Sequence, residues 1–431
     1  MFANNHKTKF MFFCNRPFVF IVLCIFSQGM AQTVNVGELN VLAGTLWATI
    51  GDFQNNNSGT FINDGETIIY GDFTNSGIVD FSNGTQGRFR FEGNTEQRLL
   101  GTSPFFFYDV QLNNPTATSA YVLANAVSIA NQVEFINGIL EVEEAEGLVV
   151  FENNATAIGA SDLSHIDGEV QKNGDDPFNY PIGNQQSFRF AAISAPEDIN
   201  ASFSGRYYLA NPVGITINGE TPTQETSVDI ALLNENEFWT ITKNGGTADV
   251  VLTLSWDENT TTPLDIVTDP ESAIRILRWD ENGQRWINEG GIIDSTNKTV
   301  TTPIRLNAYG IFTLGRATEE LVTNTQNDVP VFNFVSPNGD GHNDYLYIET
   351  IEDLVNNRLE VFNRWGVQVF ATNDYDTNGN VFEGFSNTRS TFTNDNPLPT
   401  GTYYYILSYD VTIDGRTERI KKTDFLYLTS N

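Results

Sequence analysis

Apolar and polar residues alternate along most of this chain in short runs, and a 3.6-residue period is almost absent. Between residues 250 and 256, for example, Val250, Leu252, Leu254 and Trp256 fall on one parity. A period of two is typical of a strand that buries one face. The runs are rich in Val, Ile, Thr and Phe and end at Asn-Gly or Asp-Gly corners, which suit tight turns. The pattern predicts an all-β protein.

A twenty-residue repeat marks the first part of the chain. Gly-Asp-Phe-Gln-Asn at 51–55 recurs as Gly-Asp-Phe-Thr-Asn at 71–75, and an Asn/Ser-Gly element follows each copy. A fixed period of short strands and tight corners predicts a β-solenoid over residues 32–165, in which stacked turns build the core. Phe53 and Phe73 then occupy equivalent interior positions. A meander of hairpins with a coincidental repeat is the alternative. Further short strands are expected at 89–91, 110–112, 127–129 and 133–136.

The rhythm changes around residues 150–185, where longer alternating strands begin. Residues 274–279 and 284–287 flank the turn Asp-Glu-Asn-Gly at 280–283, which predicts a hairpin. Such strands indicate a β-sandwich of immunoglobulin type over residues 166–316. The polar segment 317–330 has the composition of a linker.

The charge of the chain limits its partners. Its 54 Asp and Glu against 23 Lys and Arg give a formal net charge of −31. Such a chain repels phosphates and anionic lipid, so nucleic acid is not an expected partner, whereas divalent cations or basic protein surfaces are. Both cysteines, Cys14 and Cys24, precede residue 32, so the rest of the chain has no thiol for a disulfide or a metal site.

Residues 1–31 have the pattern of a secretory signal peptide. An apolar run at 17–26, too short to span a bilayer, follows a basic leader and precedes the small residues of Gly-Met-Ala at 29–31. Cleavage is expected near Ala31, and it would change the formal charge to −34, because three basic residues and no acidic ones are lost. No later stretch is apolar for long enough to form a transmembrane helix. The prediction is a secreted or outer-cell-surface protein.

Three motifs follow one another in the last hundred residues. They are Ser-Pro-Asn-Gly-Asp-Gly-His-Asn-Asp at 336–344, Val-Phe-Asn-Arg-Trp-Gly at 361–366 and Leu-Pro-Thr-Gly-Thr-Tyr-Tyr-Tyr at 398–405, closed by Phe-Leu-Tyr-Leu at 425–428. This ordered set resembles the gliding-motility-associated C-terminal domain, the type B sorting module of type IX secretion. The resemblance covers residues 331–431 and implies an export signal rather than a catalytic or binding activity. The predicted C-terminal domain is an immunoglobulin-like β-sandwich, with a half-buried strand at 403–411.

Two loops of this domain could hold calcium. Asn338, Asp340 and Asp344 have the alternating spacing of oxygen ligands in calcium loops, and glycines between them allow a sharp turn. The other interpretation is that these residues only form turns, with Asp344 accepting hydrogen bonds from backbone amides. The segment 374–380 copies the first half of an EF-hand loop, but Phe385 stands where the closing Glu is required, which favours a surface loop.

Catalytic groups are scarce. Beyond residue 31 the histidines are His165 and His342, in different predicted domains, so neither a His-based triad nor a multi-His zinc site is expected. No cofactor is predicted apart from calcium. A run of acidic residues is interpreted as a solvated turn: Glu141, Glu143, Glu144 and Glu146. Arg364 and Trp365 form either a recognition patch or a core Trp covered by an Arg.

The sequence favours a secreted or cell-surface protein of structural or adhesive type that is not an enzyme. Its expected partners are the type IX secretion machinery and a surface glycan or protein ligand. The alternative is a surface polysaccharide-binding or polysaccharide-degrading protein with its site on the solenoid. Clustered carboxylates opposite a stripe of exposed aromatic side chains on one face of the solenoid would favour that alternative.

Overall fold

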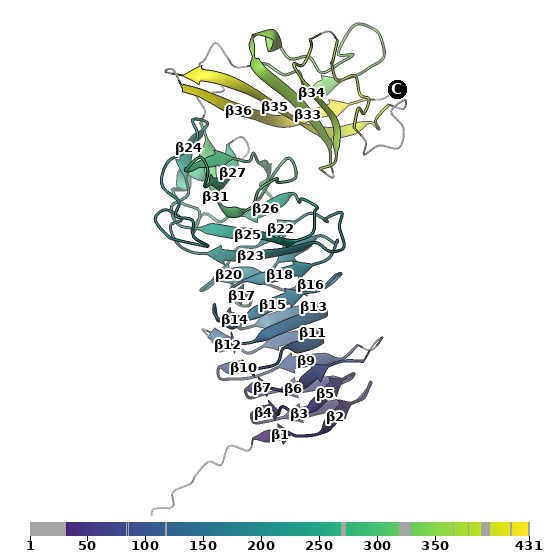
Figure 1. The fold of residues 1–431 in the computed structure, drawn as a ribbon, viewed down its shortest axis with the longest axis vertical. Helices are drawn as coiled ribbons and strands as arrows, with labels where there is room; N and C mark the ends of the chain where they lie inside the picture. Colours follow the sequence, from purple (N-terminus) through teal and green to yellow (C-terminus); the bar gives the residue numbers. More distant parts are fainter. Residues whose placement is uncertain are drawn as a thin grey trace, which may run out of the picture.

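The computed structural model describes residues 32–429, except 83, 85, 117–118, 269–272, 319–328, 365, 378, 389–396 and 414–415. The predicted signal peptide and most of the predicted linker therefore lie outside the described residues. Figure 1 shows a column of stacked strands that continues into a sandwich and is topped by a further sheet. Within the described residues, no helix has the length and apolar character needed to span a membrane.

The column is built from short strands. They are β1 (Thr33–Asn35), β2 (Glu38–Val41), β3 (Leu46–Thr49), β4 (Phe53–Asn55), β5 (Thr60–Asn63), β6 (Glu66–Ile69), β7 (Phe73–Asn75), β8 (Ile78–Asp80), β9 (Arg88–Phe91), β10 (Gln97–Gly101), β11 (Phe105–Asn113), β12 (Ser119–Leu123), β13 (Ala126–Asn137), β14 (Ile139–Val142), β15 (Leu148–Phe151), β16 (Thr156–Ile158), β17 (Ile166–Asp167), β18 (Val170–Asn173) and β20 (Ile182–Asn184).

Successive turns of the column stack in parallel. Thr33 lies opposite Phe53, and Phe53 lies opposite Phe73, so β1, β4 and β7 begin the first face. The second face begins with β2, β5 and β8, and the third face with β3, β6 and β9. This arrangement is a β-solenoid of about six turns, which confirms the prediction from the repeat. The parallel pairing excludes a meander of hairpins over these turns.

Two long strands join the second and third faces. The start of β11 pairs with β8, while residues 109–112 pair with β9, and the register shifts between Phe107 and Asp109. β13 repeats this path, pairing first with β15 and then with β16. The strands expected at 127–129 and 133–136 are therefore two halves of one strand that rounds a corner.

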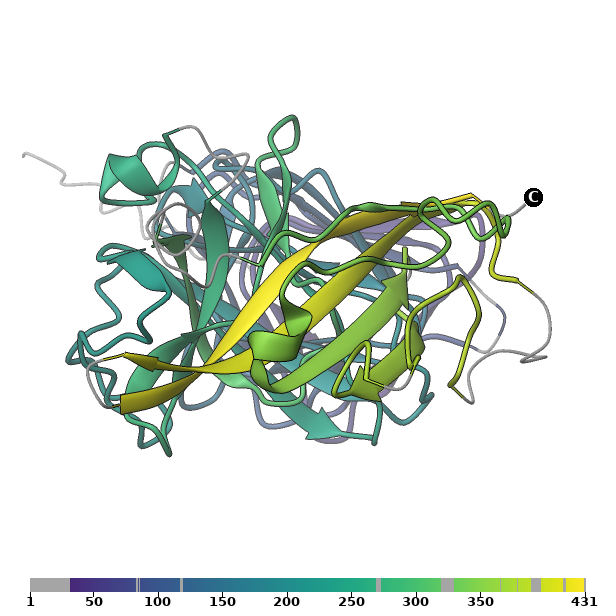
Figure 2. The ribbon, with the colours of Figure 1, turned by 90° about the horizontal axis from the view of Figure 1, so that it is seen from above.

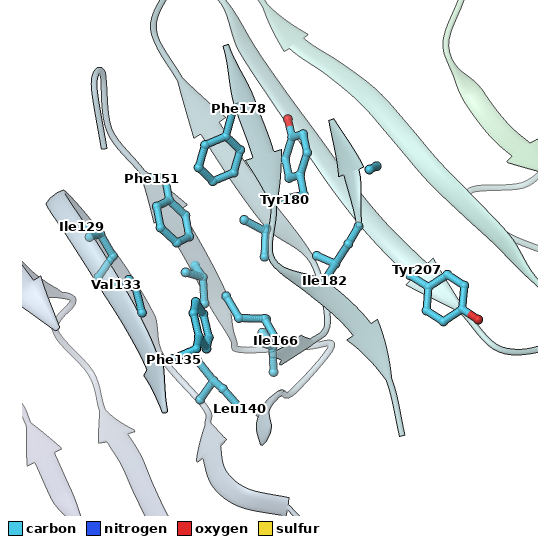
Figure 3. Close-up of a cluster of buried hydrophobic side chains, with 14 of the residues drawn as sticks. Ile129, Val133, Phe135, Leu140, Phe151, Ile166, Phe178, Tyr180, Ile182 and Tyr207 are labelled. Carbon is cyan, nitrogen blue, oxygen red and sulfur yellow. The ribbon is translucent and has the colours of Figure 1, made fainter. Parts of the chain in front are cut away.

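Aromatic side chains fill the solenoid interior. Phe53 and Phe73 are 1% and 0% exposed, and their ring centroids lie 5.1 Å apart. Phe105 continues the stack, 4.8 Å from Phe73. The predicted stacking of Phe53 on Phe73 is confirmed. Figure 3 shows the later part of the same core, where Phe151, Phe178 and other apolar side chains converge between the strands.

The sandwich continues the solenoid without a break in its core. One contiguous cluster of buried side chains extends from Val41 to Leu314. β18 pairs with β15 of the solenoid on one side and, antiparallel, with β23 on the other. The further elements are β19 (Phe178–Tyr180), β21 (Ser187–Phe188), β22 (Ala191–Ile193), β23 (Ser202–Tyr208), β24 (Ile230–Leu233), β25 (Phe238–Gly245), β26 (Leu252–Ser255), the 3-10 helix η1 (Leu264–Ile266), β27 (Ile274–Asp280), β28 (Arg285–Asn288), β29 (Ile292–Asp294), β30 (Thr299–Thr301) and β31 (Gly310–Ala317).

Two sheets form the sandwich. One has the order β19-β22-β26-β30-β29, and the other carries β23, β25, β31 and β27. Val250, Leu252, Leu254 and Trp256 are all at most 4% exposed, as their shared parity predicts. The expected hairpin joins β27 to β28 and pairs Trp279 with Trp286.

The C-terminal domain has a core of its own. Its elements are β32 (Phe334–Val335), the 3-10 helix η3 (Ile351–Asp353), β33 (Val355–Asn363), β34 (Gln368–Asn373), β35 (Gly401–Ile413) and β36 (Arg416–Leu428). The strands form one sheet in the order β32-β36-β35-β33-β34. Its inner face buries Tyr403, Tyr405 and Leu407. The second layer consists of turns and isolated bridges, such as Val331 with Ile348. Seen from above, β35 and β36 cross over the end of the column (Figure 2).

Candidate functional site

The predicted calcium ligands come together in one exposed loop before η3. Both carboxylate oxygens of Asp344 accept backbone hydrogen bonds, Oδ1 from Asn338 at 3.1 Å and from Gly339 at 2.7 Å, and Oδ2 from Gly341 at 2.8 Å. Asp340 accepts from the His342 amide at 2.8 Å and from Nδ2 of Asn338 at 2.8 Å. These contacts, that from Asn338 first, hold the pKa of Asp340 below its usual value. The carboxylates of the loop thus accept hydrogen bonds from amide groups of the same loop.

The second acidic loop is only partly described. Asp374 and Asp376 are exposed and have positive φ angles of 51° and 61°, as expected for tight turns. Asn378 lies outside the described residues. Trp365 does too, so whether it forms a recognition patch or a core residue covered by Arg364 stays a prediction. Arg364 itself is exposed in the turn between β33 and β34. Among the described residues, no group of three or more His, Cys, Asp or Glu side chains is placed to hold a metal ion.

The histidine of the solenoid region is buried in the protein interior. His165 is 0% exposed, and its Nδ1 lies 2.9 Å from the Ser161 carbonyl oxygen. Burial lowers the pKa of His165, so the ring is neutral at pH 7. His342 lies in the exposed loop of the C-terminal domain. The structure does not bring the two histidines into one site.

The acidic run, which begins at Glu141 in β14 and continues just after that strand, lies on the solenoid surface. Glu143 forms an ion pair with Arg98 at 3.1 Å, and Glu144 forms one with Arg206 at 2.9 Å. Glu144 is 76% exposed, and its partner is on β23 of the sandwich. These are solvated pairs of the kind that contribute little to stability.

Charged side chains form a ladder across the third face of the solenoid. Arg90 on β9 pairs with Glu66 on β6 at 2.8 Å and also contacts Glu92. Arg88 lies 3.6 Å from Glu134 on β13, which also accepts a hydrogen bond from Gln111 at 2.7 Å. Arg88 and Arg90 therefore each lie beside at least one carboxylate, and cross-strand pairs of this kind stabilise the stacking of the turns.

Aromatic side chains gather at the corner beside this ladder. Phe81 and Tyr108 pack edge to face with ring centroids 5.4 Å apart, and Phe106 is 43% exposed. Tyr108 directly precedes Asp109, whose carboxylate accepts a hydrogen bond from Asn131 at 2.7 Å. We call Phe81, Phe106 and Tyr108 the aromatic corner. Phe106 is exposed, whereas Phe81 and Tyr108 are half-buried, so the corner offers one exposed ring instead of the stripe of exposed aromatic side chains expected of a glycan-binding face.

A polar cluster lies inside the sandwich. Glu237 is fully buried and accepts hydrogen bonds from Tyr207 at 2.9 Å and from Asn234 at 3.3 Å. Arg189 donates to Thr260 at 2.8 Å and lies 3.8 Å from Glu237. Burial raises the pKa of Glu237. Arg189 also lies 3.2 Å from Asp257 and 4.0 Å from the exposed Asp162, so it links the buried Glu237 to carboxylates nearer the surface.

The C-terminal domain has a separate core, and the carboxylates of its exposed loop at 338–344 accept hydrogen bonds from the loop's own backbone. Residues 329–428 match the family model of the CHU_C type IX secretion signal domain. The resemblance identified from the three motifs is thereby confirmed. The chain is thus exported by type IX secretion as a secreted or cell-surface protein, and the machinery of that system recognises this domain. Comparisons with curated proteins and with solved structures give no match.

Two sets of surface residues escaped the sequence analysis. The aromatic corner depends on the register shift in β11 between Phe107 and Asp109, and no local sequence pattern predicts that shift. In β36, by contrast, Phe425 and Tyr427 alternate with the buried Leu426 and Leu428. That alternation was present in the closing motif and could have indicated that the two aromatic side chains face outward.

Proposed function

We propose that the protein is a structural or adhesive component of the cell surface, in which the solenoid and sandwich form one rod. The single core that extends from Val41 to Leu314 supports this proposal most directly. A hinge would separate two cores, whereas here the sheets continue through the β18–β23 pair. A rod with an export signal at one end is suited to presenting its other end away from the cell.

The export part of the proposal is tested by deletion. A chain that keeps residues 1–328 but lacks 329–428 should accumulate in the periplasm, and the intact chain should reach the surface or the medium. Fusing residues 329–431 to a reporter with a signal peptide should carry the reporter outward. Surface delivery of the truncated chain would refute this assignment.

The adhesive part needs a separate measurement. Cells that lack the protein should attach less to a surface or to one another than cells that carry it, and the full chain supplied on the surface should restore attachment. Equal attachment with and without the protein would favour a different surface role.

The aromatic corner supports a second candidate function, a polysaccharide-binding surface. The exposed Phe106 ring, with the half-buried Tyr108 beside it in β11, can stack on a sugar ring while Asp109 and neighbouring polar groups hydrogen-bond to hydroxyls. The mature chain should then bind members of a glycan array, and Tyr108→Ala with Phe106→Ala should weaken binding at least tenfold. Phe385→Ala, which removes an aromatic side chain 40% exposed in the C-terminal domain, is the matched control. An array without any binding would dismiss this candidate.

We further propose that the protein is not an enzyme. The buried neutral His165 and the pairing of Glu66, Glu92 and Glu134 with arginines support this view, because a general base needs access to substrate. Release of reducing ends from any glycan that the protein binds would overturn it.

A further inference from the structure

The C-terminal domain carries aromatic side chains on its outside. Phe425, Tyr427 and Phe334 are 53%, 42% and 43% exposed, and Phe332 and Tyr347 are 48% and 43% exposed. We call these five residues the aromatic surface. All lie within the matched segment 329–428. None belongs to the buried cluster that forms the core of the domain.

Strand register explains why these rings face outward. In β36 the two leucines that flank Tyr427 are fully buried, so Phe425 and Tyr427 must point away from the core. Phe334 of the edge strand β32 lies opposite Tyr427, and the two rings stack at 6.3 Å with an interplanar angle of 15°. Tyr404 of β35 lies opposite Phe425. Phe332 and Tyr347 extend the surface beyond the sheet, with ring centroids 5.4 Å apart.

The aromatic surface is costly to leave in water unless something binds it. Exposed apolar patches of this kind mark interaction sites, and Phe and Tyr are enriched at the centres of protein interfaces. The domain does not need these rings for its fold, because its inner face already supplies a core. A surface role is therefore the better explanation of five half-exposed aromatic side chains in one segment.

We propose that the aromatic surface is where a protein of the type IX secretion machinery binds this domain. This inference rests on the export function, which requires that some protein of the secretion system binds residues 329–428. A second copy of the chain is a poorer occupant, because each copy carries a net charge of −31 and repels the other. The exposed aromatic rings suit a protein partner that buries them in a complementary apolar groove.

Substitution of the outward rings tests the proposal. Threonine preserves strand propensity, so Phe334→Thr, Phe425→Thr and Tyr427→Thr together should leave the domain folded. We expect at least a tenfold loss of surface delivery of the full chain, with folded protein retained in the periplasm. Phe385→Thr, which removes a similarly exposed ring from a loop of the same domain, should be delivered at the parental level.

Several outcomes would overturn the proposal. Parental delivery of the triple variant would do so, even if deletion of 329–428 still blocks export; in that case the export function stands and only this surface is wrong. An equal defect in Phe385→Thr would show a general sensitivity of the domain. If thermal melting shows that the triple variant is unfolded, surface delivery of the single variants Phe425→Thr and Tyr427→Thr is compared with that of Phe385→Thr instead. Parental delivery of both single variants would then overturn the proposal.

Crosslinking provides a readout that does not depend on loss of folding. A benzophenone amino acid at position 425 of the otherwise intact chain should crosslink to a secretion-system protein, identified by mass spectrometry. The product should be missing in cells without that system and with the probe at position 385. A crosslink to a second copy of the chain, or to no protein in secreting cells, would contradict the proposal.

Discussion

Two of the repeated residues, Phe and Asn, have different roles in the solenoid. Phe53 and Phe73 fill the interior, whereas Asn55 and Asn75 form a buried hydrogen-bonded ladder. Asn55 donates from Nδ2 to the Asn75 side-chain oxygen at 2.9 Å and accepts from Asn35 at 2.9 Å. It also donates to the Ile78 carbonyl at 2.9 Å. The ladder satisfies the backbone where each turn changes direction, which an apolar side chain could not do.

Truncation of an interior ring should be costly. Phe73→Ala should lower the free energy of unfolding by roughly 3–5 kcal/mol, because it removes a fully buried ring that contacts Phe53 and Phe105. Phe106→Ala, on the outside of the same solenoid, should change it by less than about 0.5 kcal/mol. Chemical denaturation of both variants makes the comparison, and similar losses would be inconsistent with the interior assignment.

The loop around Asp340 gives a second prediction at this scale. Since its carboxylates already accept backbone N–H groups, we expect calcium to leave the melting temperature of the full chain unchanged. A bound ion would instead stabilise the folded state by about 2.7 kcal/mol at a hundredfold excess over its dissociation constant. A rise specific to calcium and abolished by Asp340→Ala would establish Asn338, Asp340 and Asp344 as ligands.

At the scale of elements, the sequence predicted the stacking register of the turns that repeat but not the register of the turns whose spacing varies. Phe53 and Phe73 are separated by one period, so their stacking could be read from the sequence. On the first face, Leu99 pairs with Phe73, 26 residues earlier. Leu123 pairs with Leu99, 24 residues earlier. Without a constant spacing, the register depends on corners and on the joined strands β11 and β13, which only the three-dimensional structure defines.

Removal of one complete turn tests this modular stacking. Deletion of residues 53–72 should give a folded protein, because Phe73 would take the place of Phe53 opposite Thr33. Its stability should fall only by the contribution of one turn and its interfaces, as in other repeat proteins. Deletion of 53–62, half a period, should disrupt the stack. Circular dichroism and thermal melting distinguish the two, and equal damage would argue against interchangeable turns.

At the scale of the whole molecule, the two largest buried clusters are separate from each other, and a smaller one lies in the sandwich around Trp279 and Trp286. The first extends through solenoid and sandwich, and the second belongs to the C-terminal domain. The sequence indicated three regions, but it gave no sign that the first two share a core. That continuity arises from the antiparallel pairing of β18 with β23, a contact between residues about thirty positions apart.

Two cores should give two thermal transitions in calorimetry, because domains with independent cores unfold independently. Deletion of 329–428 should remove one transition and leave the other nearly unchanged. Phe73→Ala should shift only the transition that survives this deletion. A single transition that moves as a whole in both variants would show that the domains unfold as one unit.

The strands of the solenoid lie across the long axis of the molecule, so the hydrogen bonds between turns run along it (Figure 1). A tensile force along that axis would load the bonds of one turn at a time instead of shearing many together. Each twenty-residue turn that peeled away would lengthen from about 5 Å of stacked height to roughly 70 Å of extended chain. A cell held by such a protein would have a tether that yields in small steps and dissipates a sudden pull.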